Sequence, residues 1–180
     1  MKSLIELNNI SFEYNNNKIL KNINLEIKEG EKIALIGKSG AGKTTLISIL
    51  NGTKSQTYGD IKIFGKNFNN LYNSHKRKIG TIWQDLRLID DLSAEQNVNC
   101  GLLSNQNLIF TFKNLLNLST FYKAHQCMEL CQLNSGIYSK NLKNMSGGQK
   151  QRIAISRSII QEPEILFADE PFNNLDPKLC

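Results

Sequence analysis

The sequence is poor in the residues that metal sites, disulfide frameworks and nucleic-acid surfaces require. Its 180 residues include two histidines, four cysteines, four arginines and one tryptophan. Cys127 and Cys131 form a Cys-x-x-x-Cys pair, but no second pair or histidine cluster completes a metal site, so we expect free thiols. The formal charge of +6 comes mostly from lysines spread along the chain, without a basic stripe that contains aromatic residues. Nucleic acid is therefore not an expected partner.

Long apolar runs are also missing. The most apolar stretches, residues 33–36 and 165–168, are much shorter than the roughly 20 residues that cross a bilayer. Residues 1–6 do not start a long apolar segment that ends at a small-residue cleavage site. We therefore expect neither a membrane span nor export. The hydrophobic fraction of 40% predicts one packed globular domain.

The spacing of apolar residues predicts the order of the elements. Residues 4–14 and 23–27 alternate like an antiparallel pair of strands with one buried face. Residues 32–36 form an apolar run too short for a helix, which predicts a buried strand. Further strands are expected at 60–64, 79–83 and 165–168, helices at 45–50, 106–118 and 120–133, and a capping box at Ser93 and Gln96.

A glycine-rich segment lies between the expected strand at 32–36 and the helix after it. It reads Gly37-Lys38-Ser39-Gly40-Ala41-Gly42-Lys43-Thr44, is followed by Thr45, and fits the pattern G-x-x-x-x-G-K-[ST]. Its glycines allow backbone N–H groups to converge on phosphate oxygens, and the helix N-terminus adds partial positive charge. Lys43 would reach the terminal phosphates and Thr44 would ligate Mg²⁺. A chance glycine-rich turn is the alternative, which the flanking elements disfavour.

Two acidic residues, Asp169 and Glu170, follow the expected strand at 165–168. A carboxylate at the tip of an adjacent parallel strand can hold the same Mg²⁺, and a second carboxylate can act on water as a general base. By themselves the two residues fit a strand end that meets solvent equally well. Together with the glycine-rich loop they predict a nucleoside triphosphatase that uses ATP or GTP.

A second anion site is expected where Ser146, Gly147, Gly148 and Gln149 begin a long helix. This helix N-terminus has no lysine of its own, so it suits a phosphate supplied by another molecule. A plain N-cap is the alternative. The stretch resembles the signature motif of ATP-binding cassette (ABC) ATPases, and the resemblance extends in the family's order over practically the whole chain.

The resemblance implies an α/β fold. A P-loop NTPase core of the RecA-like type would carry an N-terminal antiparallel β subdomain and a helical insert. Residues 1–180 would form one ABC ATPase domain, in which 1–84 and 162–180 make the nucleotide-binding core. Residues 85–161 would make the helical subdomain that carries the signature motif.

The resemblance also assigns roles to single residues. Tyr14 would stack on adenine, although core packing is the ordinary role of an aromatic residue at a strand end. Gln84 would sense Mg²⁺ and the γ-phosphate, and would act in catalysis with the base Glu170. Thr44, Gln84 and Asp169 would be the Mg²⁺ ligands. Asp176 would belong to a loop that crosses the dimer interface.

The function that the resemblance implies is that of the ATP-binding subunit of an ABC transporter. ATP and Mg²⁺ are the expected cofactors, and a second copy of the chain is expected to form a head-to-tail dimer with it. Transmembrane permease subunits would supply the pathway at the cytoplasmic face of the cell membrane, with a solute-binding protein if the transporter is an importer. Residues 79–84 and 92–98 look most like phosphonate-importer ATPases.

The sequence departs from the family at its C-terminal end. It stops at Cys180, shortly after Asp176, whereas cassette ATPases continue through another strand to a switch histidine. His75 and His125 both precede the signature motif and are expected at the surface. We therefore expect a C-terminally truncated cassette, and a nucleotide-binding module with little or no turnover is one alternative function. A soluble ABC ATPase that does not serve transport is the other.

Overall fold

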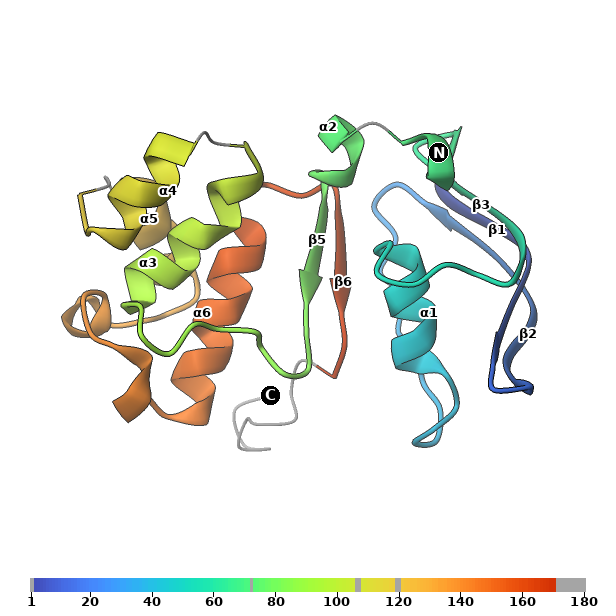
Figure 1. Ribbon diagram of the computed structural model, residues 1–180, viewed down its shortest axis with the longest axis horizontal. Helices are drawn as coiled ribbons and strands as arrows, with labels where there is room; N and C mark the ends of the chain where they lie inside the picture. The colour runs from blue at the N-terminus through green and yellow to red at the C-terminus, as the bar shows by residue number, and fades with distance from the viewer. Residues whose placement is uncertain (1, 72, 106–107, 119–120, 171–180) are drawn as a thin grey trace. The chain divides into compact units, whose positions relative to one another are not determined.

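The computed structural model describes residues 2–71, 73–105, 108–118 and 121–170. The chain folds as two compact units, Met1–Lys76 and Arg77–Cys180 (Figure 1). The first unit is built on an antiparallel sheet, and the second combines a parallel pair of strands with a layer of helices.

The sheet of the first unit has the strand order β2-β1-β3-β4. A hairpin joins β1 (Ser3–Tyr14) to β2 (Asn17–Lys28) through Asn15 and Asn16, whose φ angles of 49° and 62° suit a tight two-residue turn. This confirms the expected antiparallel pair. β3 (Tyr58–Ile63) pairs with β1, and β4 (Lys66–Asn67) pairs with β3. One face of the sheet buries Ile5, Leu7, Ile10, Ile61 and Ile63.

The first helix, α1 (Lys43–Leu50), starts two residues before the expected helix at 45–50. It buries Leu46, Ile49 and Leu50 and ends at Asn51, directly before Gly52, whose φ is 80°. The unit closes with a 3-10 turn, η1 (Phe68–Asn70), and the short helix α2 (Asn73–Lys76).

The expected buried strand at residues 32–36 is wrong. Residues 31–38 have an irregular backbone, and among the described residues no strand pairs with them. Ile33, Leu35 and Ile36 are 55%, 45% and 92% exposed. An apolar run favours burial, but a strand also needs a neighbouring strand whose backbone groups pair with its own. The residues of the run do not specify which strand, if any, lies beside them.

In the second unit, β5 (Ile79–Ile82) and β6 (Ile165–Ala168) run parallel, side by side (Figure 1). They confirm the expected strands at 79–83 and 165–168 to within one residue. The helical layer consists of α3 (Ala94–Asn99), η2 (Cys100–Asn105), α4 (Leu108–Leu115), α5 (Tyr122–Leu130), η3 (Ser135–Ile137), η4 (Leu142–Asn144) and α6 (Gly147–Ile159).

α6 is the central helix of this layer and packs against α3, α5 and β5. Its residue Ile153 and its C-cap residue Ile160 are fully buried in a core with Val98, Met128 and Leu142. The capping box expected at Ser93 and Gln96 is present at the start of α3. None of the described helices is both long and apolar enough to cross a membrane.

Both histidines were expected at the surface, and His125 is partly exposed there but also makes specific contacts. Its Nε2 lies 2.6 Å from the Glu95 carboxylate, and its side chain is 43% exposed. Its ring also packs between Phe121 and Tyr138. This residue therefore joins α5 to α3, a long-range pairing that a position in the sequence does not reveal. His75 is partly buried beside Phe64 and Lys66.

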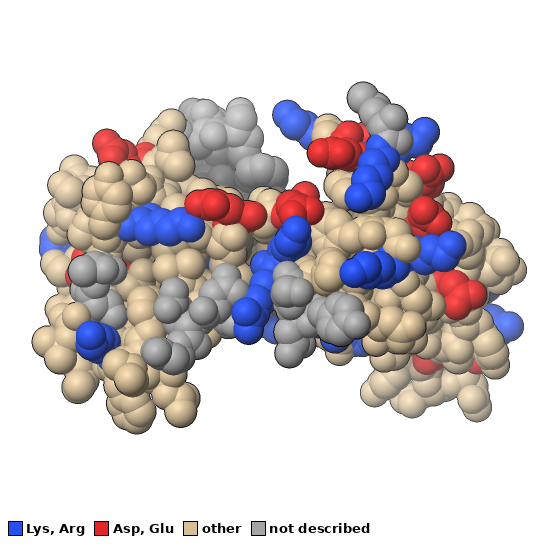
Figure 2. All heavy atoms as spheres, turned by 90° about the horizontal axis from the view of Figure 1, so that it is seen from above, with Lys and Arg blue, Asp and Glu red and all other residues tan. Residues whose placement is uncertain are grey.

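The described cysteines Cys100, Cys127 and Cys131 are free thiols, as expected. Burial raises the pKa of the Cys100 and Cys127 thiols, which makes them less reactive. On the face that Figure 2 shows, lysine and arginine side chains are interspersed with acidic ones.

Candidate nucleotide-binding site

The glycine-rich loop of the first unit leads directly into the N-terminus of α1. Gly40 and Gly42 have φ angles of 78° and 90°, a left-handed region that glycine adopts without strain. Gly42 occupies the N-cap position and has no side chain to cap the helix, and the first turn contains no acidic residue. The positive end of the helix dipole is therefore not neutralised by α1 itself.

The Lys43 side chain turns back over this loop. Its Nζ donates hydrogen bonds to the carbonyl oxygens of Gly37 and Lys38, at 2.8 and 3.0 Å. These bonds hold a full positive charge against residues 37–42. Thr44 is exposed on the same first turn, and Thr45 is partly exposed. An ammonium group, helix N–H groups and a hydroxyl therefore lie within one short segment.

Tyr14 is the last residue of β1 and is 62% exposed. This exposure is not that of a core residue, so the structure rules out core packing as its role. An exposed aromatic ring at a strand end is able to stack on a planar group.

A second group of polar residues lies at one edge of the parallel pair in the second unit. Ile82 of β5 is paired with Ala168 of β6, and the Asp169 amide donates a 3.0 Å hydrogen bond to the Ile82 carbonyl. Gln84 and Glu170 each lie two residues beyond these paired positions. Parallel neighbouring strands have their carboxyl ends at the same edge of a sheet. Gln84, Asp169 and Glu170 therefore follow two adjacent strand ends.

The three residues of this strand-end group differ in burial. Asp169 is only 3% exposed, whereas Gln84 and Glu170 are exposed. The φ angle of Glu170 is 46°, a left-handed conformation that is uncommon outside glycine, asparagine and aspartate. Such outliers concentrate where the surrounding structure imposes a particular side-chain direction.

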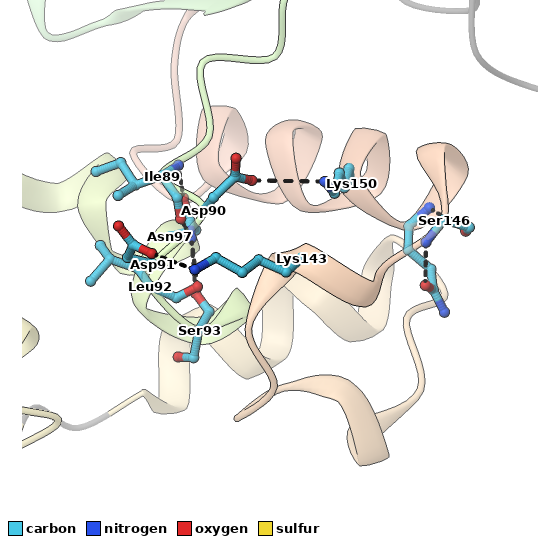
Figure 3. Close-up of polar contacts among 10 residues, drawn as sticks. Ile89, Asp90, Asp91, Leu92, Ser93, Asn97, Lys143, Ser146 and Lys150 are labelled. Carbon is cyan, nitrogen blue, oxygen red and sulfur yellow. Dashed lines mark hydrogen bonds and ion pairs between the residues drawn. The ribbon is translucent and has the colours of Figure 1, made fainter.

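Ser146 is the N-cap of α6, as the sequence predicts. Its Oγ accepts a 3.2 Å hydrogen bond from the Gln149 amide, and its own amide donates to Gln149 Oε1 at 3.0 Å (Figure 3). Ser146 and Gly147 are exposed and Gly148 is partly exposed. The Gln149 side chain is engaged in this capping box, so it points back to its own helix.

Sequence reasoning missed several residues that surround the segment after Gln84. Arg157 of α6 donates hydrogen bonds to the carbonyls of Leu86 and Arg87. The Arg87 guanidinium carbon lies 3.6 Å from the centre of the Trp83 ring. Burial lowers the pKa of the Arg157 guanidinium from its usual value, but a guanidinium stays charged at neutral pH. No local pattern marks these contacts, because they join residues about 70 positions apart.

Asn97, fully buried in α3, was also missed. Its Oδ1 accepts a 2.8 Å hydrogen bond from the Ile89 amide, and its Nδ2 donates to the Ile89 carbonyl at 3.0 Å. Two ion pairs lie nearby, Asp91 with Lys143 at 2.9 Å and Asp90 with Lys150 at 3.7 Å (Figure 3). In the sequence, Asn97 is marked only by its place four residues after the helix N-cap Ser93. That position is a weak indication of a buried polar contact.

The candidate Mg²⁺ ligands are a threonine hydroxyl, an amide and a carboxylate, on Thr44, Gln84 and Asp169. All three offer oxygen, the donor that Mg²⁺ prefers, so these residues fit the ion chemically. Among the described residues no group of three or more His, Cys, Asp or Glu side chains could hold a metal ion. Asp176, expected at a dimer interface, lies outside the described residues.

Comparison with known proteins decides the family, because residues 20–173 match the ABC transporter family. The chain belongs to this family. It is 37% identical to the phosphonates import ATP-binding protein PhnC of Fusobacterium nucleatum, over 99% of this chain and 73% of that protein. It is 39% identical to the spermidine/putrescine import ATP-binding protein PotA of Desulfitobacterium hafniense, over 99% of this chain and 48% of that protein. The chain thus spans about half the length of the second relative.

Two solved structures of ABC cassettes have the same fold. One is a dimeric structure of a post-hydrolysis state bound to ADP and Pi, with a TM-score of 0.79, 31% identity, and coverage of 97% of this chain and 77% of that chain. The other is a dimeric structure of a bacterial ABC transporter cassette, with a TM-score of 0.79, 30% identity and the same coverage. These matches confirm the predicted α/β cassette fold, with its antiparallel β subdomain and its helices.

Proposed function

We propose that this chain is the ATP-binding subunit of an ABC importer and that it binds ATP through residues 37–45. The observation that carries the proposal is the pair of hydrogen bonds from Lys43 to the Gly37 and Lys38 carbonyls. They hold an ammonium group over a glycine loop at an uncapped helix N-terminus, and a polyphosphate needs this combination of charge and N–H donors. Tyr14 stacks on the adenine ring in this proposal.

Glu170 is the proposed general base. Its carboxylate accepts a proton from water while the water oxygen forms a bond to the γ-phosphorus, and the bond from that phosphorus to the β,γ-bridging oxygen breaks. The products are ADP and phosphate. Gln84 orients the water from the neighbouring strand end. Mg²⁺, held by Thr44, Gln84 and Asp169, would neutralise charge on the phosphate oxygens.

A second copy of the chain is the proposed partner across the nucleotide. Ser146, Gly147 and Gly148 present an exposed helix N-terminus without a cation of its own, which suits the phosphates bound by the other copy. Gln149 contributes by capping this turn through its side chain. Both similar solved cassettes are dimeric, which supports a dimer here. Asp176 is proposed to lie at the same interface.

The remaining parts of the proposal concern layout and partners. Residues 1–84 and 162–180 form the nucleotide-binding core, and residues 85–161 form the helical subdomain. The chain works at the cytoplasmic face of the membrane with transmembrane permease subunits and a solute-binding protein. The first candidate solute is a phosphonate, because the Fusobacterium relative is a phosphonates import protein. The second candidate is a polyamine, because the Desulfitobacterium relative, a spermidine/putrescine import protein, is similar to the same degree. Uptake of labelled methylphosphonate and spermidine, with and without this chain, separates the two.

Binding and hydrolysis measured on three variants test the ATP site. Lys43→Ala is expected to weaken binding of a fluorescent ATP analogue by about tenfold or more, because a charge aimed at the phosphates is lost. Lys21→Ala, at an exposed lysine of β2 in the same unit, is the matched control and leaves binding unchanged. Glu170→Gln keeps binding and lowers phosphate release, because an amide accepts no proton. Unchanged binding in Lys43→Ala would refute the ATP site.

A further inference from the structure

The segment that follows Gln84 has a backbone conformation that its own residues do not favour. Leu86 and Arg87 have φ angles of 56° and 46°, so two consecutive residues other than glycine are left-handed. Side chains with a Cβ rarely adopt this region, and such a turn persists only when surrounding contacts impose it. Local hydrogen bonds support the turn, because the Leu86 and Arg87 amides donate to the Trp83 and Asp85 carbonyls. The Leu86 and Arg87 carbonyls are bound from another element.

Arg157, in the last turn of α6, supplies contacts of this kind. Its Nη1 donates to the Arg87 carbonyl at 2.6 Å, and its Nη2 donates to the Leu86 carbonyl. The planar guanidinium offers both donors in a fixed geometry, so it specifies the orientation of two successive peptide groups at once. The backbone at Arg157 is itself tightly packed, because a Cβ at Gly101 of η2 would collide with the Arg157 carbonyl oxygen.

Other contacts fix the far end of the same segment. Asn97 binds both backbone groups of Ile89, and the ion pairs of Asp90 and Asp91 reach Lys150 and Lys143 (Figure 3). The ion pairs are solvent-exposed and contribute little, whereas Asn97 is fully buried. Residues 86–89 are therefore attached to α6 at one end and to α3 at the other.

We propose that Arg157 is a positioning residue for Gln84, because it holds the left-handed turn that begins two residues after it. The proposal rests on the role proposed above for Gln84 at the nucleotide. Arg157 and Ser146 belong to one helix and its N-cap. A shift of α6 when Ser146 meets the nucleotide of a second copy would therefore pull on the Leu86 and Arg87 carbonyls. Arg157 would thus connect the N-terminus of α6 at Ser146 with the segment that follows Gln84.

The chain contains a natural reporter of this turn. Trp83 is its only tryptophan, lies directly before Gln84, and carries the Arg87 guanidinium at 3.6 Å from its ring centre. Arg157 binds the Arg87 carbonyl, and the Arg87 guanidinium covers the Trp83 ring, so loss of Arg157 reaches the indole through the turn. Displacement of Arg87 uncovers the ring and increases its quenching by acrylamide.

Acrylamide quenching of Trp83 in the nucleotide-free chain tests the proposal. Arg157→Met removes the donors and keeps a long unbranched side chain, and we expect the quenching constant to rise about twofold. Arg157→Lys keeps the charge without the planar fork, and we expect a smaller rise. Arg152→Met is the matched control, because Arg152 is on the same helix and donates to the Gln132 carbonyl instead. Its quenching should equal that of the parent.

Two outcomes would overturn the role of Arg157 in holding the turn. One is parental quenching in Arg157→Met, and the other is an equal rise in Arg152→Met, which would indicate a general loosening of α6. Circular dichroism checks that each variant folds. If Arg157→Met does not fold, parental quenching in Arg157→Lys overturns the proposal in its place.

A titration with Mg²⁺ and ATP separates this inference from the proposed function. In the parent chain, Mg²⁺ and ATP should change Trp83 emission. Arg157→Met should bind a fluorescent ATP analogue with parental affinity through residues 37–45, but should require several-fold more Mg²⁺ for the emission change. A parent whose Trp83 ignores Mg²⁺ and ATP would refute the role of Gln84, even if the quenching difference persisted.

Discussion

At the scale of single residues, the glycine loop depends on two positions with different constraints. Gly40 and Gly42 both have left-handed φ angles, but their surroundings differ. A Cβ at Gly40 would have no atom within 4 Å, whereas a Cβ at Gly42 would lie 2.9 Å from Leu20 Cδ2 and 3.3 Å from the Ile19 carbonyl oxygen. The first position therefore needs glycine for its conformation alone, and the second also needs it for space.

This difference predicts unequal losses of stability. Gly40→Ala should lower the free energy of unfolding by about 1–2 kcal/mol, the usual cost of a left-handed alanine. Gly42→Ala should cost about 1 kcal/mol more, because β2 or α1 must shift to admit the methyl group. Urea denaturation of the two variants beside the parent measures both values. A loss in Gly40→Ala as large as that in Gly42→Ala would mean that Leu20 moves aside freely.

At the scale of elements, the α3 end of the segment between β5 and α3 is held by one buried side-chain amide, that of Asn97. Asn97 accepts from the Ile89 amide and donates to the Ile89 carbonyl, and it is 0% exposed. A buried backbone group that loses its partner costs about 1–3 kcal/mol. This segment has no regular structure of its own, so the side chain of α3 replaces the hydrogen bonds that a helix or sheet would supply.

We therefore expect Asn97→Ala to lower the free energy of unfolding of the second unit by about 1–2 kcal/mol, since two part-buried backbone groups of Ile89 lose their partner. Asn141→Ala is the matched control, because Asn141 is exposed in the same unit and its side chain caps no helix. It should change stability by less than about 0.5 kcal/mol. Thermal unfolding followed by circular dichroism measures both. If both variants lost similarly little stability, water would be replacing the Asn97 side chain at the Ile89 backbone, and the prediction would be wrong.

The elements also show how far the sequence alone could predict this structure. The capping boxes of Ser93 and Ser146 were predictable, because they depend on residues three positions apart. The shared edge of Gln84 and Glu170 comes from the parallel pairing of β5 with β6, which the sequence did not predict. The strand at 32–36 failed because pairing needs a neighbour that the run does not encode. Arg157 and Asn97 were missed because side chains that bind distant backbone leave no periodic pattern.

At the scale of the whole molecule, the N-terminus of α6 has a role within one copy and a proposed role between two. Within one copy, Ser146 caps the helix through the Gln149 amide. Between copies, the same exposed turn would meet the phosphates of the partner's ATP. Substitutions that abolish the cap would mix the two roles, so a useful variant must keep the cap and change only the charge. Aspartate and asparagine cap helices about as well as serine.

This reasoning makes Ser146→Asp and Ser146→Asn a matched pair. Both should keep the stability of the single copy, and both should bind ATP through residues 37–45 as the parent does. Ser146→Asp should weaken ATP-dependent dimerisation by about tenfold or more, because its carboxylate faces phosphate, whereas Ser146→Asn should leave it nearly unchanged. Light scattering with added ATP, in a Glu170→Gln background that prevents hydrolysis, measures the dimer. Equal dimerisation in the two variants would place the partner's phosphates elsewhere, because a negative charge held against a polyphosphate cannot be neutral.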